Sequence, residues 1–209
     1  MSDRPSATRP TGQPAAGESK MTSIYSGSLQ GQLLVAMPNM GDPRFDRAVI
    51  YMCEHTPEQA MGLVINHPSE SVAFSDLLQQ FDISQPKDSN GIQIHMGGPL
   101  ETTRGFVLHS ADYVQRGSLI ISETMALTAN VDILRAIAHN EGPHHSLLAL
   151  GYASWGPSQL ESEIMDNVWL HIEADEELVF CTEPSQKWLR AMSKLGIDVS
   201  LLSADVGHA

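Results

Sequence analysis

Short apolar runs and alternating apolar–polar runs of strand length dominate the hydrophobic pattern of the chain. Gln32–Met37 is nearly all apolar and is ended by Pro38, which predicts a strand covered on both faces. Ser146–Ala153 is the most hydrophobic of these runs. The same patterns predict further strands at Ala48–His55, Gly62–His67, Ile92–Met96, Gly105–His109, Ser118–Ser122 and Val168–Glu173. A polar turn at Thr56–Gln59 makes two of them a β-hairpin.

Helical periodicity is found between the groups of strands. Phe74, Leu77, Leu78 and Phe81 follow the spacing i, i+3, i+4, i+7 of an amphipathic helix. Further helices are predicted at three places: after a cap at Thr128 or Asn130, after Gly156-Pro157, and from Pro184 to a stop at Gly196. Because strands occur in groups and helices are interspersed irregularly, the pattern favours one α+β domain over a doubly wound α/β sheet.

Residues 96–109, with the sequence MGGPLETTRGFVLH, form the first candidate site. Gly97 and Gly98 can bring bare backbone amides close to a partner, and Pro99 fixes the direction in which the turn leaves. Arg104 and His109 follow, so the turn is expected at a rim where two strands of one sheet end. Exposed amides beside an arginine favour an anionic group.

The segment Tyr152–Glu161 is a second candidate site, because it connects a buried strand to a helix. Its spacing of glycine and serine is GxxSxG, which does not match the GxSxG nucleophile elbow of hydrolases. Ser158 and Glu161 instead predict a capping box at the start of the helix, and Trp155 is expected to pack against that helix.

Two groups of side chains suggest metal binding or thiol chemistry, each with a simpler alternative. Strand alternation places Cys53 and His55 on one face, where a thiolate–imidazole pair competes with an ordinary buried cysteine. The loop His139–His145 holds three histidines and one glutamate, but the spacing matches no recognised zinc pattern. We expect no cofactor and no metal, and the sequence leaves both alternatives open.

Composition limits the possible partners. The formal net charge is −13, with 25 acidic and 12 basic residues, and no basic run is present, so nucleic acid is an unfavourable partner. Residues 1–25 are rich in Pro, Ser, Thr, Gly and Ala and are expected to be a disordered tail before a domain at 26–209. The apolar runs are too short to span a membrane, and no signal peptide is evident, so we expect a cytoplasmic monomer.

Four segments in order resemble the YqgE/AlgH family of bacterial proteins. They are FDRAVI…EH with MGLVIN (45–66), GGP…RGFVLH (97–109), LGYASWGPSQLE (150–161) and W…LGI (188–197). The resemblance covers residues 26–209 and implies a strongly bent, mixed or antiparallel sheet that forms a partly closed pseudo-barrel flanked by helices. Ser158 stands where the family usually has glycine, which we expect to matter little because serine caps helices well.

The resemblance implies no established activity, although the family has been described as a transcriptional regulator. We hypothesise a non-enzymatic binding module for an unknown protein or a small anionic ligand. Its binding residues would be Asn66, Gly97, Gly98, Arg104, His109, Tyr152, Trp155, Gln159 and Glu161. One alternative is a hydrolase that uses His55 or His109 with Glu161, with or without a metal. Another is a regulator that binds DNA directly, which the acidic charge disfavours.

Overall fold

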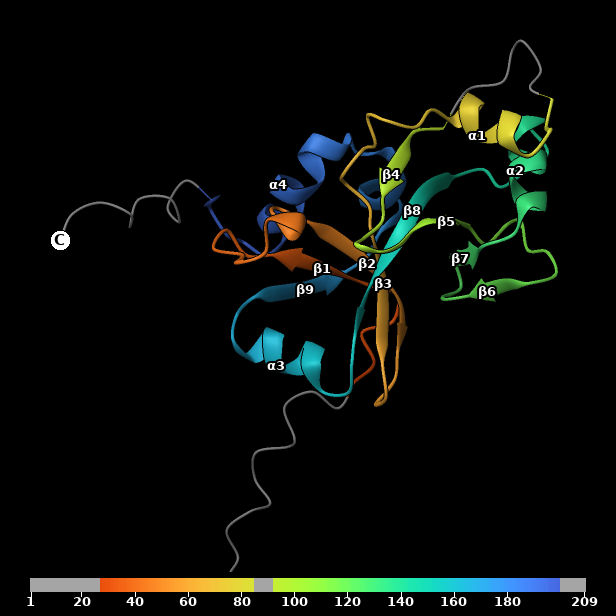
Figure 1. The fold of residues 1–209 in the computed structure, drawn as a ribbon. Coiled ribbons are helices and arrows are strands. Elements are labelled where there is room, and N and C mark those ends of the chain that lie inside the picture. Colours follow the sequence, from red (N-terminus) through yellow and green to blue (C-terminus); the bar gives the residue numbers. More distant parts are fainter. Residues whose placement is uncertain (1–26, 85–91, 200–209) are drawn as a thin grey trace, which may run out of the picture.

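The computed structural model describes residues 27–84 and 92–199. In these residues nine strands form one sheet, which curls into a half-barrel (Figure 1). The strands are β1 Gln32–Ala36, β2 Val49–His55, β3 Ala60–Val64, β4 Ile94–Met96, β5 Leu100–Ser110, β6 Ser118–Ile120, β7 Met125–Thr128, β8 Ser146–Trp155 and β9 Trp169–Glu173. Their order is β6-β7-β5-β8-β3-β2-β1-β9, and β4 pairs with β8 in parallel whereas the other pairings are antiparallel.

Four α-helices and two short helical turns accompany this sheet in the described residues. They are the 3₁₀ turn η1 Pro43–Phe45, α1 Phe74–Gln80, α2 Val131–Ala138, α3 Gln159–Met165, the π-helical turn η2 Glu177–Cys181 and α4 Pro184–Lys194. In Figure 1, α1 and α2 lie at the end of the sheet near β5 and β7, and α3 and α4 lie at the end near β1 and β9.

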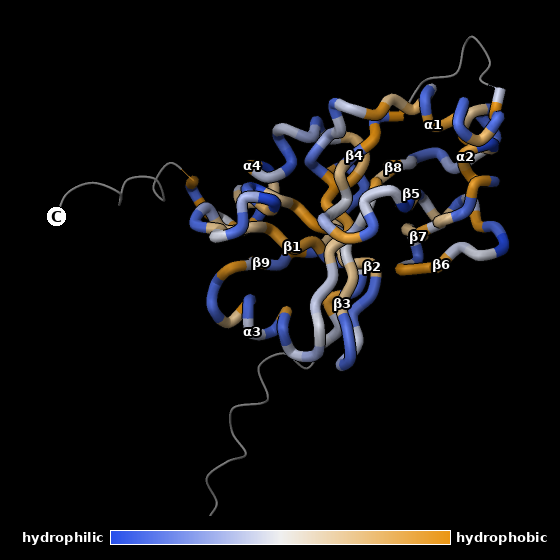
Figure 2. Tube along the Cα trace, in the orientation of Figure 1, coloured by the Kyte–Doolittle hydropathy of each residue, from blue (hydrophilic) through white to orange (hydrophobic). Residues whose placement is uncertain are grey.

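Apolar side chains fill both faces of the sheet, because the predicted alternation sends successive residues of each strand to opposite sides. One cluster joins α4 and η2 to the sheet, a second joins α3 to the opposite face of β1 and β2, and a third lies beneath α1 and α2. Figure 2 shows that the central strands are mostly apolar, whereas the tip of the β2–β3 hairpin is hydrophilic.

The predicted fold is confirmed: the chain is a mixed α+β domain with a curled, mainly antiparallel sheet, and the β2–β3 hairpin is present. The sequence pattern missed β7 and η2, and β5 begins at Leu100 rather than at Gly105. No described helix has the length and apolar character needed to cross a bilayer. The predicted tail, residues 1–25, lies outside the described residues.

The turn at Gly97–Gly98 is pressed backbone-to-backbone against β8. A Cβ atom on Gly97 would lie 2.4 Å from the carbonyl oxygen of Gly151, and one on Gly98 would lie 2.1 Å from the carbonyl carbon of Tyr152. Gly151 itself has a φ of +75°, a conformation that glycine adopts without strain. These contacts require glycine because the neighbouring atoms belong to the main chain and cannot rotate away.

We expect Gly97→Ala to lower the free energy of unfolding by about 3 kcal/mol or more, because the added methyl group forces β8 away from the turn. Gly105→Ala is the control in the same region, because its Cβ would meet only the Leu148 and Leu150 side chains, at 3.9 Å. Its expected cost is below about 1 kcal/mol. Urea denaturation measures both values, and equal losses in the two variants would contradict the role assigned to the glycine turn.

Candidate functional site

A bulge in β5 produces the most distinctive exposed surface of the predicted site. Leu100 pairs with Tyr152 and Gly105 pairs with Leu150, so the four residues from 101 to 104 lie opposite the single residue Gly151. The extra residues cannot join the ladder and are pushed out of the sheet. Glu101, the first of them, takes a φ of +43°, which is uncommon for a residue with a side chain.

Polar and aromatic contacts hold this bulge in one arrangement. Arg104 Nη1 donates to Glu101 Oε2 at 3.0 Å, and the Tyr152 hydroxyl donates to Glu101 Oε1 at 3.2 Å. The Arg104 guanidinium lies 5.0 Å from the centre of the Phe106 ring, which meets Tyr152 edge-to-face at 5.8 Å. The hydrogen bond from Arg104 lowers the pKa of the Glu101 carboxyl below its usual range.

One large apolar side chain lies next to the polar group. Leu100 is 41% exposed, directly precedes Glu101 and pairs with Tyr152. We call the set Leu100, Glu101, Arg104 and Tyr152 the bulge surface. In Figure 1 this segment crosses in front of β8 between the labels β4 and β5.

The amide of Gly97 is not exposed, contrary to the expectation from sequence. It donates to Leu150 O at 2.7 Å, and the carbonyl of Gly97 accepts from Val64 N at 2.8 Å, so the residue bridges β8 and the end of β3. Asn66 is also engaged by the backbone: its side chain accepts from Val49 N at 2.7 Å and donates to Arg47 O at 2.9 Å. These contacts give both residues a structural role.

His109 lies apart from the bulge surface. The imidazole is fully buried, with Nε2 2.9 Å from Thr128 Oγ1 and Nδ1 3.0 Å from the carbonyl of Ser110. Burial lowers its pKa. His109 pairs with Ser146 at the first residue of β8, whereas the helix that carries Glu161 follows the last residue of that strand, about 30 Å of extended chain away. The structure therefore does not bring His109 and Glu161 together.

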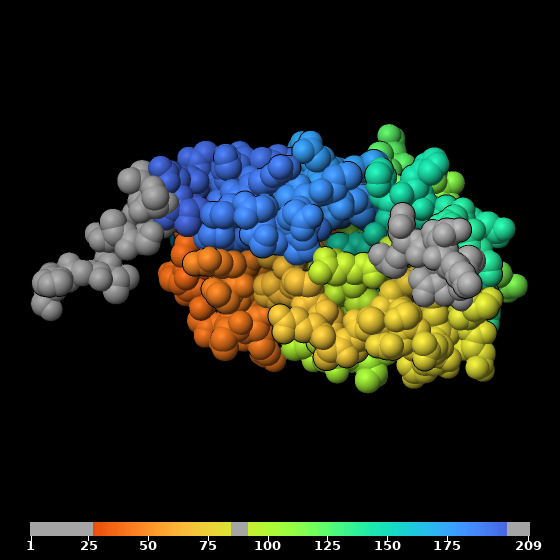
Figure 3. Space-filling view, turned by 90° about the horizontal axis from the view of Figure 1, so that it is seen from above, coloured from red at the N-terminus to blue at the C-terminus, as the bar shows by residue number. Residues whose placement is uncertain are grey.

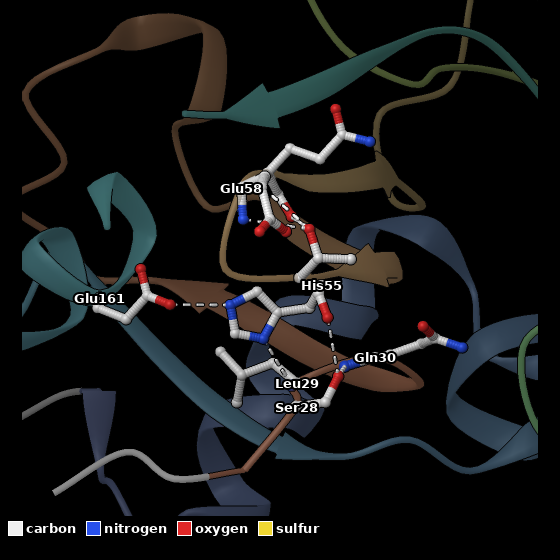
Figure 4. A network of polar contacts seen from close by, with 8 residues as sticks. Ser28, Leu29, Gln30, His55, Glu58 and Glu161 are labelled. Carbon is white, nitrogen blue, oxygen red and sulfur yellow. Dashed lines mark hydrogen bonds and ion pairs between the residues drawn. The ribbon is translucent and has the colours of Figure 1, made fainter. Parts of the chain in front are cut away.

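His55 and Glu161 do meet, as the hydrolase alternative requires. His55 Nε2 lies 3.0 Å from Glu161 Oε1, and His55 Nδ1 accepts a hydrogen bond from the backbone amide of Leu29 at 2.9 Å (Figure 4). Since Nδ1 is an acceptor, the ring proton is on Nε2 and is donated to the carboxylate. Both ring nitrogens are occupied, so the contact fixes the segment around Leu29 and leaves no ring nitrogen open to a substrate.

Cys53 and His55 are on opposite faces of β2, which corrects the shared face expected from strand alternation. The register of β2 against β3 shifts between Met52 and Glu54, and this bulge reverses the alternation after Cys53. Cys53 is completely buried in the cluster beneath α4, and burial raises the pKa of its thiol. A thiolate–imidazole pair is therefore excluded here, and Cys53 is a core residue.

Trp155 and Gln159 belong to a network organised by Glu163, a contact that the sequence did not predict. Glu163 Oε2 accepts from the indole nitrogens of Trp155 at 2.9 Å and Trp169 at 2.8 Å, and its Oε1 accepts from Gln159 Nε2 at 2.8 Å. The two indole rings meet edge-to-face at 6.0 Å. The network joins α3 to the ends of β8 and β9.

The predicted capping box at Ser158 is absent. Ser158 makes no side-chain hydrogen bond at the start of α3 and has a φ of +58°, in the left-handed region. The first turn is instead closed by Gln159, whose side-chain oxygen accepts from Gly156 N at 3.1 Å. A left-handed backbone explains why glycine suits this position better than serine.

The histidines of the loop at 139–145 point to separate partners. His139 Nδ1 contacts Arg135 O at 2.8 Å, His144 Nδ1 lies 3.1 Å from Asp112 Oδ2, and His145 stacks on Phe180. In residues 27–84 and 92–199, no group of three or more His, Cys, Asp or Glu side chains is arranged to hold a metal ion.

Sequence reasoning also missed two buried bases, His95 on β4 and Lys187 on α4, which are 4% and 2% exposed. Lys187 lies on the same face of α4 as the buried residues Trp188 and Ala191, and this position in the helical pattern could have predicted its burial. His95 carries no comparable signal, because a histidine in a three-residue strand fits either face.

A family model described as AlgH-like matches residues 33–200. The chain belongs to the AlgH-like family. It is 48% identical to a UPF0301 protein of Bradyrhizobium diazoefficiens, over 96% of this chain and 99% of that protein. It is 50% identical to a UPF0301 protein of Rhodospirillum rubrum, over 88% of this chain and 96% of that protein.

Solved structures agree with the fold of this AlgH-like chain. The solution structure of the AlgH protein from Pseudomonas aeruginosa superposes with a TM-score of 0.72 at 41% identity, covering 90% of this chain and all of that one. A crystal structure of a protein from Corynebacterium diphtheriae has a TM-score of 0.64 at 22% identity, with coverage of 81% and 88%, and shows the fold alone.

We expect Ser158→Gly to raise the stability of this AlgH-like chain by up to about 1 kcal/mol, because glycine adopts the left-handed backbone without strain. Ser158→Ala is the matched control and is expected to change stability by less than about 0.5 kcal/mol, since no capping hydrogen bond is lost. Thermal unfolding measures both variants. If Ser158→Ala lowered the free energy of unfolding by about 1 kcal/mol, the Ser158 side chain would be a helix cap after all.

We expect Glu163→Ala to lower the free energy of unfolding by about 2–4 kcal/mol, because two indole N–H groups lose their acceptor in a half-buried site. Denaturant titration followed by tryptophan fluorescence measures the loss. The exposed Glu58 provides the control, and Glu58→Ala should stay within about 0.5 kcal/mol of the parent. Similar values for the two variants would contradict the network.

Proposed function

We propose that this AlgH-like chain is a non-enzymatic, cytoplasmic binding module that engages a protein partner through the bulge surface. The observation that carries the proposal is the four-residue bulge opposite Gly151, which displays Glu101 and Arg104 outside the sheet. A bulge that re-aims charged side chains is a common feature next to binding sites. Any regulatory role would act through that partner.

The composition of the bulge surface supports a protein partner over a small anion. Tyrosine and arginine are enriched at protein interfaces, and the surface combines both with an exposed leucine. Arg104 is already paired with Glu101, so its charge is partly neutralised and its remaining N–H groups are suited to a carbonyl or a carboxylate on another protein. Tyr152 and Phe106 hold the pair in place, which reduces the entropy lost on binding.

The hydrolase alternative has one observation in its favour, the 3.0 Å contact between His55 and Glu161. General-base catalysis needs a ring nitrogen that can take a proton from a substrate or from water. In this network Nδ1 accepts from Leu29 and Nε2 donates to Glu161, so we interpret the contact as structural. Direct DNA binding is disfavoured by the net charge of −13.

The test uses a photo-crosslinking amino acid at Thr103 of the full chain, in cells that produce the protein naturally. We expect irradiation to join the chain to one or a few proteins, identified by mass spectrometry. Arg104→Glu should remove these products, because it replaces the attractive charge and breaks the pair with Glu101. Once a partner is purified, Arg104→Ala should weaken its affinity about tenfold, the size of a modest interface hot spot.

Arg135→Glu is the matched control, because Arg135 forms an exposed pair with Asp132 at the same i, i+3 spacing on α2. It should leave the cross-linked products and the affinity unchanged. Retention of the same products by Arg104→Glu, or their equal loss in Arg135→Glu, would remove the bulge surface from the proposal.

A further inference from the structure

A cleft on another part of the molecule holds two buried bases with incomplete hydrogen bonding. It has a volume of about 190 Å³ and lies between β4, the start of β8 and the segment that runs from η2 into α4. In Figure 3 the blue C-terminal segment and the yellow-green segment that includes β4 border a hollow, and the teal of β8 is visible at its floor. The cleft meets β8 at Ser146 and Leu147, whereas the bulge surface meets that strand at Tyr152, about 16 Å further along.

His95 is the first of the two bases. His95 lines the cleft, its two ring nitrogens are shielded from solvent, and neither has a hydrogen-bond partner in the described structure. Main-chain groups of Gln93 and Leu148 are close enough to favour the protonated ring, but they do not complete a hydrogen bond. A buried polar group without a partner is costly, and such groups commonly mark a place where water or a ligand binds.

Lys187 is the second base and enters the cleft from α4. Its ammonium group donates to the carbonyl oxygens of Ile65 and Val179, which accounts for two of its three donors. Val179 belongs to the π-helical turn η2, a distortion that is frequent at functional sites. No carboxylate of the described residues forms an ion pair with Lys187, so the third N–H and the charge remain available to a ligand.

The protonation states follow from burial. Desolvation lowers the pKa of Lys187 to about 8, and desolvation together with the charge of Lys187 lowers the pKa of His95 to about 4. At pH 7 the cleft therefore contains one ammonium ion and one neutral imidazole. The other titratable groups that face these two bases are Cys181, Glu183 and His67.

We propose that this cleft is a binding site for a small monocarboxylate with a short apolar chain. One carboxylate oxygen accepts from the free N–H of Lys187, and the second accepts from the N–H of His95. The apolar chain lies against Leu147, Phe180 and Pro184, which also line the cleft. Together these contacts satisfy the two groups that the protein leaves incomplete.

The size and charge of the cleft set the ligand class. At about 30 Å³ for each water molecule, 190 Å³ corresponds to roughly six waters, which is smaller than the sites that hold drug-sized ligands. A single ammonium ion with Glu183 nearby suits a monoanion better than a phosphate dianion. The structural role of Lys187, which links η2 to the end of β3, explains two of its donors but not the unpartnered ring of His95.

The test is a titration of the full chain with sodium propionate, followed by NMR of the ¹³C-labelled lysine side chains, with sodium chloride at equal ionic strength as the reference. Because an opposite charge favours the ammonium form, saturating propionate should raise the titration midpoint of Lys187 by about 1 pH unit. Propionate should accordingly bind about tenfold more tightly at pH 7 than above the bound-state pKa. An unchanged midpoint would overturn the proposal without any need for a variant.

Two variants test whether propionate binds at Lys187, and a second anion tests the ligand class. Lys187→Met should weaken propionate binding at least tenfold, whereas Lys194→Met, the same change at an exposed position of α4 that pairs with Asp175, should leave it unchanged. Inorganic phosphate should bind more weakly than propionate. Tighter binding of phosphate would overturn the monocarboxylate assignment, and propionate binding that survives Lys187→Met would overturn the site. The bulge surface is not involved, so failure here leaves the proposed protein partner unaffected.

Discussion

The backbone contact between the Gly97–Gly98 turn and Gly151 is the constraint on which the rest of the arrangement depends. β8 lies at the centre of the sheet and pairs with β3, β4 and β5, so the position of each of these strands is set against it. Gly97 joins two of them directly, because it donates to Leu150 and accepts from Val64. A side chain at the turn would separate the backbones that make these hydrogen bonds.

Both candidate sites follow from this contact. The turn places Leu100 opposite Tyr152, and the return to regular pairing at Gly105 leaves four residues outside the ladder, which creates the bulge surface. On the other side of the turn, β4 is held parallel to β8, and His95 is held at the border of the cleft with Lys187. A single close packing of main chains therefore positions both the bulge surface and one border of the cleft.

The sequence predicted the fold class and the β2–β3 hairpin, because the alternation of apolar residues and the turn residues act locally. It predicted the family from the order of four motifs along the chain. It predicted the faces of individual residues less well. The bulge after Met52 moves His55 to the face opposite Cys53, and alternation alone contains no sign of that shift. Ser158 was predicted as a cap from its residue type, yet its backbone is left-handed and its side chain caps nothing.

The candidate site was predicted only in part for the same reason. Arg104 and Tyr152 both bind Glu101, and Glu161 meets His55, but Asn66 and Gly97 are engaged by the backbone and His109 is buried elsewhere. Residue type identified these positions as able to bind a ligand. Which of them are exposed depends on the pairing of strands that are distant in the sequence. The two buried bases were missed because burial of a lysine or a histidine depends on which distant strand and helix enclose it.

Amide hydrogen exchange, followed by NMR on the free protein, tests whether the backbone of the glycine turn is buried and hydrogen-bonded while the backbone of the bulge is exposed to solvent. We expect the amides of Gly97 and Val64 to exchange only through global unfolding, with the same protection as the core of β8, and the amides of residues 101–104 to exchange faster by orders of magnitude. If the Gly97 amide exchanged as fast as the amides of the bulge, the turn would be an open loop and could not be the contact that sets the register of the sheet.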